Sequence, residues 1–453
     1  MRRNFNFCGI DFGTTNSTVA VSKNGVPVAL SIDPFNKNPK ILKSLIYLNP
    51  DGGREIGRRA IDRYLWDVKN ISAKPPMLVE TGKTIKTFGP STASGAGKVI
   101  FVPEIIEVDV SGRGRLLQSL KSVLTTESFK GSTIFGQFFP LENLLSVLLS
   151  QIKERAQKLL NRQLDSVVLG RPVRYVGSGK EKLALERMSA VAKNSGFKNV
   201  EFEYEPVGAA LNYGIDINTP SNVLVFDFGG GTLDVCIMNF PSQKVISVSG
   251  RPIGGDLLDS IIVENKILKY FGKGVIISKK MPMPRYFLSA LTSWYQITLL
   301  KNVKDLETLD YYITNADIQK PVQNLKNLII NDDGYNFFHR VDQTKIKLSS
   351  EDKNQFKFKC EYFSIKETIF RNEFEDMITA ELSETNKCLD EALKGASLRP
   401  SQIDKVLVTG GSSKIPVFKQ ILVQKFGADK IIDSDRFTSV ALGLGIKSEQ
   451  VFG

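Results

Sequence analysis

Histidine and cysteine are scarce in this chain of 453 residues. The single histidine, His339, lies in a polar stretch that predicts a loop, and the four cysteines, Cys8, Cys236, Cys360 and Cys388, form no C-x-x-C pair. A Ser-His-Asp triad and a histidine metal site both need imidazole, so this composition argues against both. Cys8 and Cys236 fall in predicted core strands, and buried thiols in a reducing compartment are the simpler interpretation of the cysteines.

Long apolar runs are also missing, since none approaches the roughly 18 residues that a membrane-spanning helix needs. The chain opens with Met1-Arg-Arg-Asn-Phe-Asn and enters its first motif directly, which leaves no room for a cleavable signal and makes a cytoplasmic location the expectation. The net charge of +12 would suit an anionic partner, but the lysines are spread along the chain. Neither a membrane nor a specific nucleic acid is therefore an expected partner.

The most informative stretch is Val223–Met238, an apolar run that reaches Asp227 and breaks at the glycines 229–231 before Thr232 and Asp234. Successive glycines let the backbone approach a ligand closely and turn several N–H groups toward one anion. A carboxylate at the end of the entering strand suits hydrated Mg²⁺. The stretch predicts a loop for a nucleotide polyphosphate and its metal, although a glycine-rich hairpin without a ligand would look similar.

The N-terminal stretch Phe7–Val21 has the same pattern. Asp11 corresponds to Asp227 and Gly13 to Gly229, and each copy continues into a turn and another strand. Two such hairpins over two hundred residues apart predict a duplicated fold with a pocket between its halves.

Two further stretches complete the predicted pocket. Glu205 precedes Pro206 at the start of a predicted helix, where the carboxylate either faces the pocket or simply favours the positive end of the helix dipole. The stretch Ile403–Pro416 predicts a strand, a turn at Gly410 and Gly411, and a helix. That turn either lets the flat face of an adenosine lie on the backbone or is a plain tight turn.

The length suits two lobes, each predicted to contain a core and an inserted subdomain. Lobe I spans 1–205, with core 1–33 and 141–205 and insertion 34–140, and lobe II spans 206–453, with core 206–255 and 351–453 and insertion 256–350. In the first insertion, Thr81–Ile85 and Gly89–Lys98 predict mobile loops. Gly82-Lys83-Thr84 is similar to the end of a phosphate loop, but Met77 stands where that loop needs its first glycine. Leu141–Leu160 and Phe370–Leu393 predict long helices.

Five stretches together resemble the actin-like ATPase superfamily and, within it, the nucleotide-binding domain of the DnaK-type chaperones of the heat-shock-70 family. They are Gly9-Ile-Asp-Phe-Gly-Thr-Thr-Asn-Ser17, Tyr204-Glu-Pro-Val-Gly-Ala-Ala210, Phe226-Asp-Phe-Gly-Gly-Gly-Thr-Leu-Asp234, Ile253-Gly-Gly-Asp-Leu-Leu-Asp259 and Val408-Thr-Gly-Gly-Ser-Ser-Lys-Ile-Pro416. The resemblance implies an α/β fold of the ribonuclease-H-like type, duplicated into two lobes around a central nucleotide cleft.

The resemblance also assigns roles to matching positions. Asp11 and Asp227 would hold Mg²⁺ through water, and Glu205 would support that network. Asp234 would help to place the attacking water, and Lys121 is the candidate for a lysine that the family takes from its first insertion. The implied ligands are ATP or ADP and Mg²⁺, with K⁺ as a further candidate ion. The implied nucleotide-binding positions are Gly13, Thr14, Thr15, Asn16, Gly229, Gly230, Gly231, Thr232, Gly255, Lys345, Ser349, Gly410, Gly411, Ser412 and Lys414.

The implied function is slow ATP hydrolysis to ADP and phosphate, coupled to lobe rotation, in a chaperone-type protein with protein clients or co-chaperones as partners. The chain departs from the family in two places. The adenosine pattern expects an acidic residue, a lysine and an arginine, and the chain has Asp342, Lys345 and Ile346 there. The second is that the sequence ends at Gly453, so we expect a protein without the family's peptide-binding domain, similar to the short YegD-type relatives.

Three other functions stay open at this level. One is an actin-like filament-forming ATPase, against which the large insertions argue. Another is a small-molecule kinase of the same superfamily, which would need an acidic base near a second pocket. The third is a nucleotide-binding switch without turnover, which Ile346 favours and the full set of acidic residues opposes.

Overall fold

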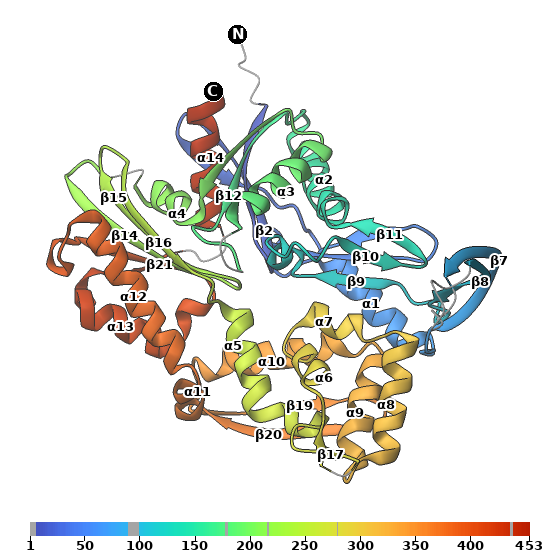
Figure 1. The fold of residues 1–453 in the computed structure, drawn as a ribbon. Helices are drawn as coiled ribbons and strands as arrows, with labels where there is room; N and C mark the ends of the chain where they lie inside the picture. Colours follow the sequence, from blue (N-terminus) through green and yellow to red (C-terminus); the bar gives the residue numbers. More distant parts are fainter. Residues whose placement is uncertain (1–5, 89–98, 177–179, 215–216, 279, 435–437) are drawn as a thin grey trace.

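The computed structural model describes residues 6–88, 99–176, 180–214, 217–278, 280–434 and 438–453 (Figure 1). Two central sheets, each with helices packed on it, make up one part of the molecule, and a mainly helical region makes up the other. The predicted loop Gly89–Lys98 lies outside the described residues.

The first sheet has the order β13-β12-β1-β2-β3, with β4 paired to β2. Strand β1 runs antiparallel to β2 and parallel to β12. Its apolar residues are buried because helices cover both faces of the sheet, which is typical of a parallel core strand. The strands are β1 (Phe7–Phe12), β2 (Asn16–Lys23), β3 (Val26–Ala29), β4 (Leu42–Lys43), β12 (Ser166–Arg171) and β13 (Asn199–Tyr204).

The second sheet has the order β16-β15-β14-β21-β22 and the same arrangement. Strand β14 runs antiparallel to β15 and parallel to β21, as β1 does to β2 and β12. The predicted duplicated α/β fold is confirmed. The strands are β14 (Ser221–Phe228), β15 (Leu233–Phe240), β16 (Lys244–Arg251), β21 (Lys405–Thr409) and β22 (Ile431–Asp433).

The helices on these sheets bury apolar stripes against them. In α2 (Leu141–Leu160), leucines at helical spacing are buried, as predicted. The predicted long helix at 370–393 is wrong, because the chain forms α11 (Arg371–Met377) and α12 (Thr379–Ala396) with a break at Ile378. The other helices are α3 (Glu181–Asn194), α4 (Glu205–Tyr213), α13 (Pro416–Phe426) and α14 (Ser439–Phe452).

Helix α14 connects the two sheets. A Cβ atom at Gly9 would lie 2.2 Å from the Leu444 backbone, and one at Gly443 would lie 1.6 Å from the Gly208 carbonyl oxygen, so α14 contacts both β1 and α4 closely. Its Leu444 belongs to a buried cluster that includes residues of both sheets. The last helix therefore packs on the first sheet although it ends the region assigned to lobe II, and the division at residue 205 stays a prediction.

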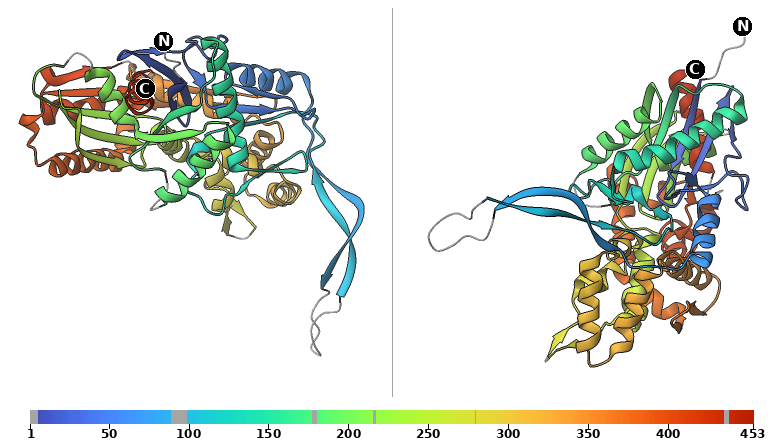
Figure 2. Two further views of the ribbon diagram at one scale, coloured as in Figure 1. Left: turned by 90° about the horizontal axis from the view of Figure 1, so that it is seen from above. Right: turned by 90° about the vertical axis from the view of Figure 1, so that its right-hand side faces the viewer.

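The first insertion contains a small sheet, a helix and a long two-stranded arm. The arm, β7 (Met77–Phe88) and β8 (Val99–Val108), projects from the body (Figure 2). The predicted loop at Thr81–Ile85 is wrong, since these residues lie within β7 and Ile85 pairs with Val102. The remaining elements are β5 (Leu45–Leu48), β6 (Arg54–Ile56), α1 (Arg58–Asn70), β9 (Arg115–Gln118), β10 (Gly131–Ile134) and β11 (Gln137–Pro140).

The second insertion is mainly helical. His339 lies in its helix α10 (Gly334–Leu348), stacked on Tyr335, and not in the predicted loop, because the helix begins five residues before it. The other elements of this part of the chain are α5 (Gly255–Ile262), β17 (Ile276–Ile277), β18 (Met281–Pro282), α6 (Arg285–Ala290), α7 (Trp294–Leu299), α8 (Val303–Asn315), α9 (Gln319–Ile330), β19 (Lys353–Lys359) and β20 (Ser364–Phe370).

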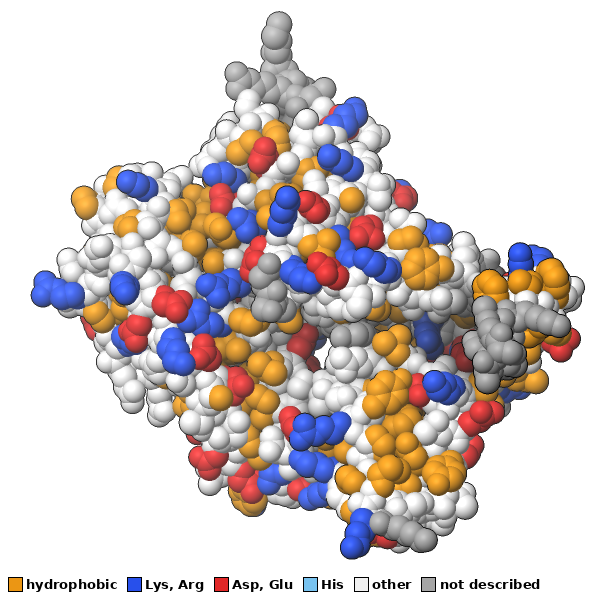
Figure 3. Space-filling view, viewed as in Figure 1, with side chains coloured by type: hydrophobic (Ala, Val, Ile, Leu, Met, Phe, Trp, Pro, Cys, Tyr) orange, Lys and Arg blue, Asp and Glu red, His pale blue; other side chains and the backbone are white. Residues whose placement is uncertain are grey.

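Charged residues of both signs are interspersed over the face shown in Figure 3. This distribution agrees with the sequence, in which the excess of lysine and arginine is spread along the chain. A nucleic-acid site would instead concentrate one sign of charge on one face.

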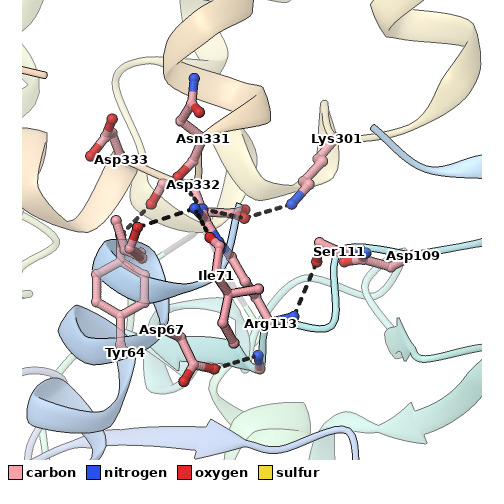
Figure 4. Close-up of polar contacts among 12 residues, drawn as sticks. Tyr64, Asp67, Ile71, Asp109, Ser111, Arg113, Lys301, Asn331, Asp332 and Asp333 are labelled. Atoms are coloured by element: carbon pink, nitrogen blue, oxygen red, sulfur yellow. Dashed lines mark hydrogen bonds and ion pairs between the residues drawn. The ribbon is translucent and has the colours of Figure 1, made fainter. Parts of the chain in front are cut away.

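The two insertions meet at Arg113 (Figure 4). Its guanidinium donates to the Ile71 carbonyl within its own insertion and, at 2.7 Å, to the Asn331 carbonyl of the other. It also lies 3.7 Å from the Asp332 carboxylate, which is paired with Lys301 at 2.5 Å. Arg113 is buried, so these contacts have little access to solvent. We call the contacts of Arg113 with Ile71, Asn331 and Asp332 the Arg113 clasp.

Replacement of this clasp tests its contribution to stability. We expect Arg113→Ala to lower the free energy of unfolding by about 2–4 kcal/mol, because three backbone carbonyls and a carboxylate lose a charged donor. Denaturant unfolding followed by circular dichroism measures the change. Arg115→Ala is the matched control, since Arg115 donates one 3.2 Å bond to the Thr298 carbonyl and should cost less than half as much. Equal losses for both variants would contradict a special contribution of Arg113.

Candidate functional site

The two glycine-containing hairpins face each other across a cleft whose empty volume, with the open solvent at its mouth included, is about 830 Å³. A Cβ atom at Gly230 would lie 2.7 Å from the Thr15 hydroxyl, and one at Gly231 would lie 3.2 Å from the Thr14 hydroxyl. Glycine is therefore needed where the loops approach each other. The described lining is Asp11, Gly13, Thr14, Thr15, Asn16, Thr18, Lys121, Ser122, Pro172, Tyr175, Val176, Glu205, Asp227, Gly229, Gly230, Gly231, Thr232, Gly410, Gly411 and Val440.

Asp11 and Asp227 stand at the ends of equivalent strands and both line the cleft. Burial raises the pKa of Asp11 to about 7, the charge of Glu205 adds to the rise, and Lys121 opposes it. Burial and the charges of Glu205 and Asp234 raise the pKa of Asp227 well above its ordinary value. The cleft therefore concentrates negative charge that its own cations do not neutralise.

Lys121 and Glu205 form a buried ion pair, with 2.7 Å between Nζ and Oε1. Burial opposes the charge on Lys121, but Glu205 and the other acidic groups raise its pKa and keep it protonated. Lys121 lies in a 3₁₀ turn, Leu120–Val123, and Glu205 begins α4. Of the two interpretations of Glu205, the structure shows the one in which its carboxylate faces the pocket.

Asp234 makes a hydrogen bond between the two halves of the fold. It lies behind the described lining and accepts from the Thr232 hydroxyl at 2.7 Å and from the backbone N–H of Val173, in the loop after β12, at 2.6 Å. Burial raises its pKa to about 7, Glu205 adds to the rise, and the Thr232 hydrogen bond lowers it. Its contacts fix the loop after β12 against β15.

The residues predicted for the adenosine side divide into two groups. Gly255, Lys345 and Ser412 lie together, since a Cβ atom at Gly255 would be 2.8 Å from the Ser412 hydroxyl and 3.1 Å from Lys345 Nζ. Lys345 Nζ is paired with the Asp259 carboxylate at 2.9 Å. Ser349, whose hydroxyl is 3.5 Å from the Lys345 carbonyl, and Lys414, which is exposed, are separate from this group. Of the residues predicted for the adenosine side, Gly410 and Gly411 belong to the described lining of the cleft, and Gly255, Lys345, Ser349, Ser412 and Lys414 do not.

Several lining residues are not predicted by the sequence: Thr18, Ser122, Pro172, Tyr175, Val176 and Val440. Pro172, Tyr175 and Val176 follow β12, where the sequence predicts only a turn. Tyr175 is 3% exposed, and burial raises the pKa of its hydroxyl to about 12. Strand β12 is equivalent to β21, and Gly410 and Gly411, which follow β21, line the cleft. This equivalence is the signal that could have predicted the loop after β12 as part of the site.

The donor set fits a hydrated Mg²⁺. Within the described residues, no group of three His, Cys, Asp or Glu side chains could hold a metal directly. Two buried carboxylates with raised pKa values, beside hydroxyls and glycine N–H groups, match an ion that keeps most of its waters. Asp11 and Asp227 are the residues that would hold it.

The sequence model of a family described as Hsp70 protein matches residues 121–285 and 309–452. The chain belongs to the Hsp70 family. It is similar to chaperone protein dnaK3 of Thermosynechococcus vestitus, 25% identical over 97% of this chain and 54% of the relative. Chaperone protein dnaK of Cyanidioschyzon merolae is 23% identical over 98% of this chain and 62% of the relative. Chaperone protein HscA of Buchnera aphidicola is 24% identical over 98% of this chain and 58% of the relative. The chain thus spans somewhat over half the length of these relatives.

Hsp70 proteins have the actin-like ATPase fold, which agrees with the paired sheets and the cleft. The four cysteines are free, and Cys360 is the one of them that is partly exposed. Among the described helices, none has the length and apolar character needed to cross a bilayer.

The raised pKa values predict a pH-dependent stability of the ligand-free protein. A carboxyl group whose pKa is higher in the folded protein than its ordinary value near 4 binds its proton more tightly in the folded state. Its contribution to stability is complete below about pH 4 and is lost as the pH rises through the folded pKa. With folded pKa values of about 7 for Asp11 and Asp234, the melting temperature in EDTA should fall between pH 5 and 8.

Asp11→Asn should reduce this fall and raise the melting temperature at pH 8 by a few degrees, because one of the repelling charges is gone. The control Asp62→Asn changes an exposed carboxylate paired with Arg58 and should leave the profile unaltered. Differential scanning fluorimetry measures all three profiles. If the melting temperature of Asp11→Asn varied with pH in the same way as that of the unmodified protein, the repulsion assigned to these carboxylates would be contradicted.

Proposed function

We propose that this Hsp70-family chain binds ATP with Mg²⁺ and slowly hydrolyses it to ADP and phosphate in the cleft between the two sheets. The observation that carries the proposal is the meeting of two aspartate-tipped glycine hairpins across one cleft, beside the buried Lys121–Glu205 pair. Phosphoryl transfer depends mainly on positioning and on neutralisation of charge, and a site without histidine can supply both.

The glycine loops bind and orient the phosphates in this proposal. Backbone N–H groups near Gly13 and of Gly230 and Gly231 donate to phosphate oxygens, and the hydroxyls of Thr14 and Thr15 donate to the same group. Gly229 N–H donates to the Thr232 carbonyl and the Thr232 hydroxyl donates to Asp234, so these two residues shape the loop around the phosphates. Asn16 follows the first loop and lines the same cleft. Mg²⁺, when bound, neutralises phosphate charge and orients the terminal phosphoryl group.

Lys121 places a positive charge at the transferred phosphoryl group, and Glu205 holds that charge in position. Asp234 acts through the loop after β12, because its hydrogen bond to Val173 N–H keeps this loop and Tyr175 at the cleft. Asp234 would also help to place the attacking water through Thr232, whose hydroxyl donates to its carboxylate at 2.7 Å. K⁺ is the candidate for a further cation among the acidic groups.

The adenosine side is formed by Gly410, Gly411 and the group Gly255, Lys345 and Ser412. Ile346 is 51% exposed where the family pattern has an arginine, so the base would rest on an aliphatic side chain. Discrimination between adenine and other bases should therefore be weaker than with a stacked arginine.

Coupling of hydrolysis to rotation of the lobes, protein clients or co-chaperones as partners, and a cytoplasmic location are the remaining parts of the proposal. The relatives named as chaperones support the first two. Unpaired cysteines support a reducing compartment.

Turnover of radiolabelled ATP by the purified chain tests the proposal, with and without unfolded polypeptide and small-molecule acceptors. Free phosphate as the product supports an ATPase. Label on an acceptor would support a kinase, and binding without turnover would support a nucleotide switch.

Replacement of Lys121 tests its part in catalysis separately from its effect on folding. We expect Lys121→Ala to lower the turnover number about 10²–10³-fold, because a preorganised charge at the reacting phosphoryl group is lost. The dissociation constant for ADP should change only a few-fold, measured by isothermal titration calorimetry.

Lys153→Ala is the control, since Lys153 is equally buried but donates to the Gly196 carbonyl away from the cleft. It should lower the melting temperature and leave the turnover of folded protein unchanged. Equal turnover in the Lys121→Ala and unmodified proteins would remove Lys121 from the mechanism.

A further inference from the structure

The arm formed by β7 and β8 has many exposed apolar side chains that the proposed function does not use. Within the described residues, its two strands form a sheet of their own (Figure 2). An isolated two-stranded hairpin is marginally stable in water, and an exposed apolar surface of this extent marks an interaction site.

Strand pairing sorts the arm's side chains into two faces, since alternate residues and directly paired residues share a face. The Phe face consists of the pairs Leu78–Glu107, Glu80–Ile105, Thr84–Pro103, Lys86–Phe101 and Phe88–Val99. Its apolar residues are highly exposed, with Phe88 at 75% and Phe101 at 69%.

The opposite, aliphatic face is less exposed and is not self-complementary. Its large side chains, Met77, Val79, Ile85, Ile100 and Ile106, range from 40% to 55% exposed. Glu104 lies in its middle, where it accepts a hydrogen bond from Thr81. Two aliphatic faces stacked about their centre would bring two Glu104 carboxylates together.

Two of the three charged residues of the Phe face, Glu80 and Lys86, are arranged symmetrically about the Thr84–Pro103 pair. The third, Glu107, lies at the base of the arm and accepts a hydrogen bond from the Val303 backbone N–H at 2.9 Å. Glu80 is opposite Ile105 and Lys86 is opposite Phe101, so the acidic and basic residues lie two β8 positions to either side of Pro103. A two-fold axis that crosses the strands at Pro103 would place Glu80 of each arm over Lys86 of the other. It would also place Phe101 over Ile105 and Phe88 over Leu78, and Glu107, whose carboxylate already accepts from Val303 N–H, over Val99.

We propose that the Phe face is a self-association surface, on which the arm of a second copy of this chain packs face to face and antiparallel. The charge complementarity selects this arrangement, since parallel stacking would put Glu80 and Lys86 over apolar side chains. Closed two-fold pairing of one surface with itself is the commonest form of homo-oligomer.

The arm's projection makes this arrangement compatible with a net charge of +12 on each copy. An arm of about ten paired positions is roughly 33 Å long, and antiparallel stacking puts the two bodies at opposite ends. This separation exceeds the Debye length of about 8 Å at physiological salt, so repulsion between the bodies is screened.

Two other occupants fit the arm less well. Insertion of the arm into a bilayer would expose the open strand edges to hydrocarbon, where their N–H and C=O groups find no partners. Addition of an extended peptide along an edge is interrupted on β8 by Pro103 and on β7 by the register irregularity between Glu80 and Thr84.

Sedimentation velocity of the full chain over a concentration series tests the proposal. The unmodified protein should form a dimer at high concentration, and Phe101→Lys should remain monomeric. Ile100→Lys is the matched control, because Ile100 is the adjacent exposed residue on the aliphatic face, and it should dimerise like the unmodified protein.

Charge reversal tests the antiparallel register. Glu80→Lys and Lys86→Glu should each raise the dimer dissociation constant about tenfold or more, since each change creates two like-charge contacts in a two-fold dimer. The double variant should restore dimerisation. Thermal melting shows that each variant is folded, and ATP turnover, which none of these residues serves, should be unchanged.

Four results would each overturn the proposal. The unmodified protein could stay monomeric at every concentration, even if it bound vesicles or unfolded polypeptide, or the dimer could survive Phe101→Lys. Ile100→Lys could lose the dimer to the same extent as Phe101→Lys, or the double variant could fail to recover dimerisation. None of these results bears on ATP turnover, so this proposal and the proposed function fail independently.

Discussion

Repulsion between buried carboxylates is the physical constraint on which this structure depends. Asp11, Asp227 and Asp234 all have raised pKa values because burial and the charge of Glu205 disfavour their ionised forms. Lys121 offsets only part of this charge. Such a cluster lowers its charge by holding protons or by gaining a counter-charge from outside. The divalent cation and polyphosphate that we propose as ligands have two parts that would match the carboxylates and the glycine loops.

The rest of the architecture holds the halves of this cleft together. Helix α14 packs backbone against backbone on Gly9 and Gly208, so the two sheets share one buried cluster behind the cleft. Asp234 makes a second connection, to the loop after β12. The Arg113 clasp joins the insertions at a third place (Figure 4). Rotation of the lobes would have to take place about α14 and Asp234 and would strain the clasp.

The arm joins the second insertion at its base, where Glu107 accepts from the Val303 backbone N–H, and its large apolar side chains are exposed on both faces. Its apolar faces differ in charge pattern, exposure and symmetry, and those differences distinguish a self-association surface from a merely exposed hairpin. The loop expected at Thr81–Ile85 was wrong because pairing with β8 continues past this stretch, from Glu80–Ile105 to Thr84–Pro103, with a register irregularity between the two pairs. The stretch itself has no alternating apolar pattern that would predict a strand.

The sequence by itself determined the duplicated fold and the two glycine hairpins, because these depend on local backbone chemistry: aspartate at a strand end, glycines that permit close approach, and a hydroxyl after them. The family, and with it the choice of Lys121 beside Glu205, came from the resemblance of five stretches. Only the tertiary structure decided that Asp234 bonds to the loop after β12, that Tyr175 and Val176 line the cleft, and that Gly255, Lys345, Ser349, Ser412 and Lys414 do not. These depend on contacts between segments remote in the chain, such as Asp234 with Val173 and α14 with the first sheet, and such contacts leave no local pattern.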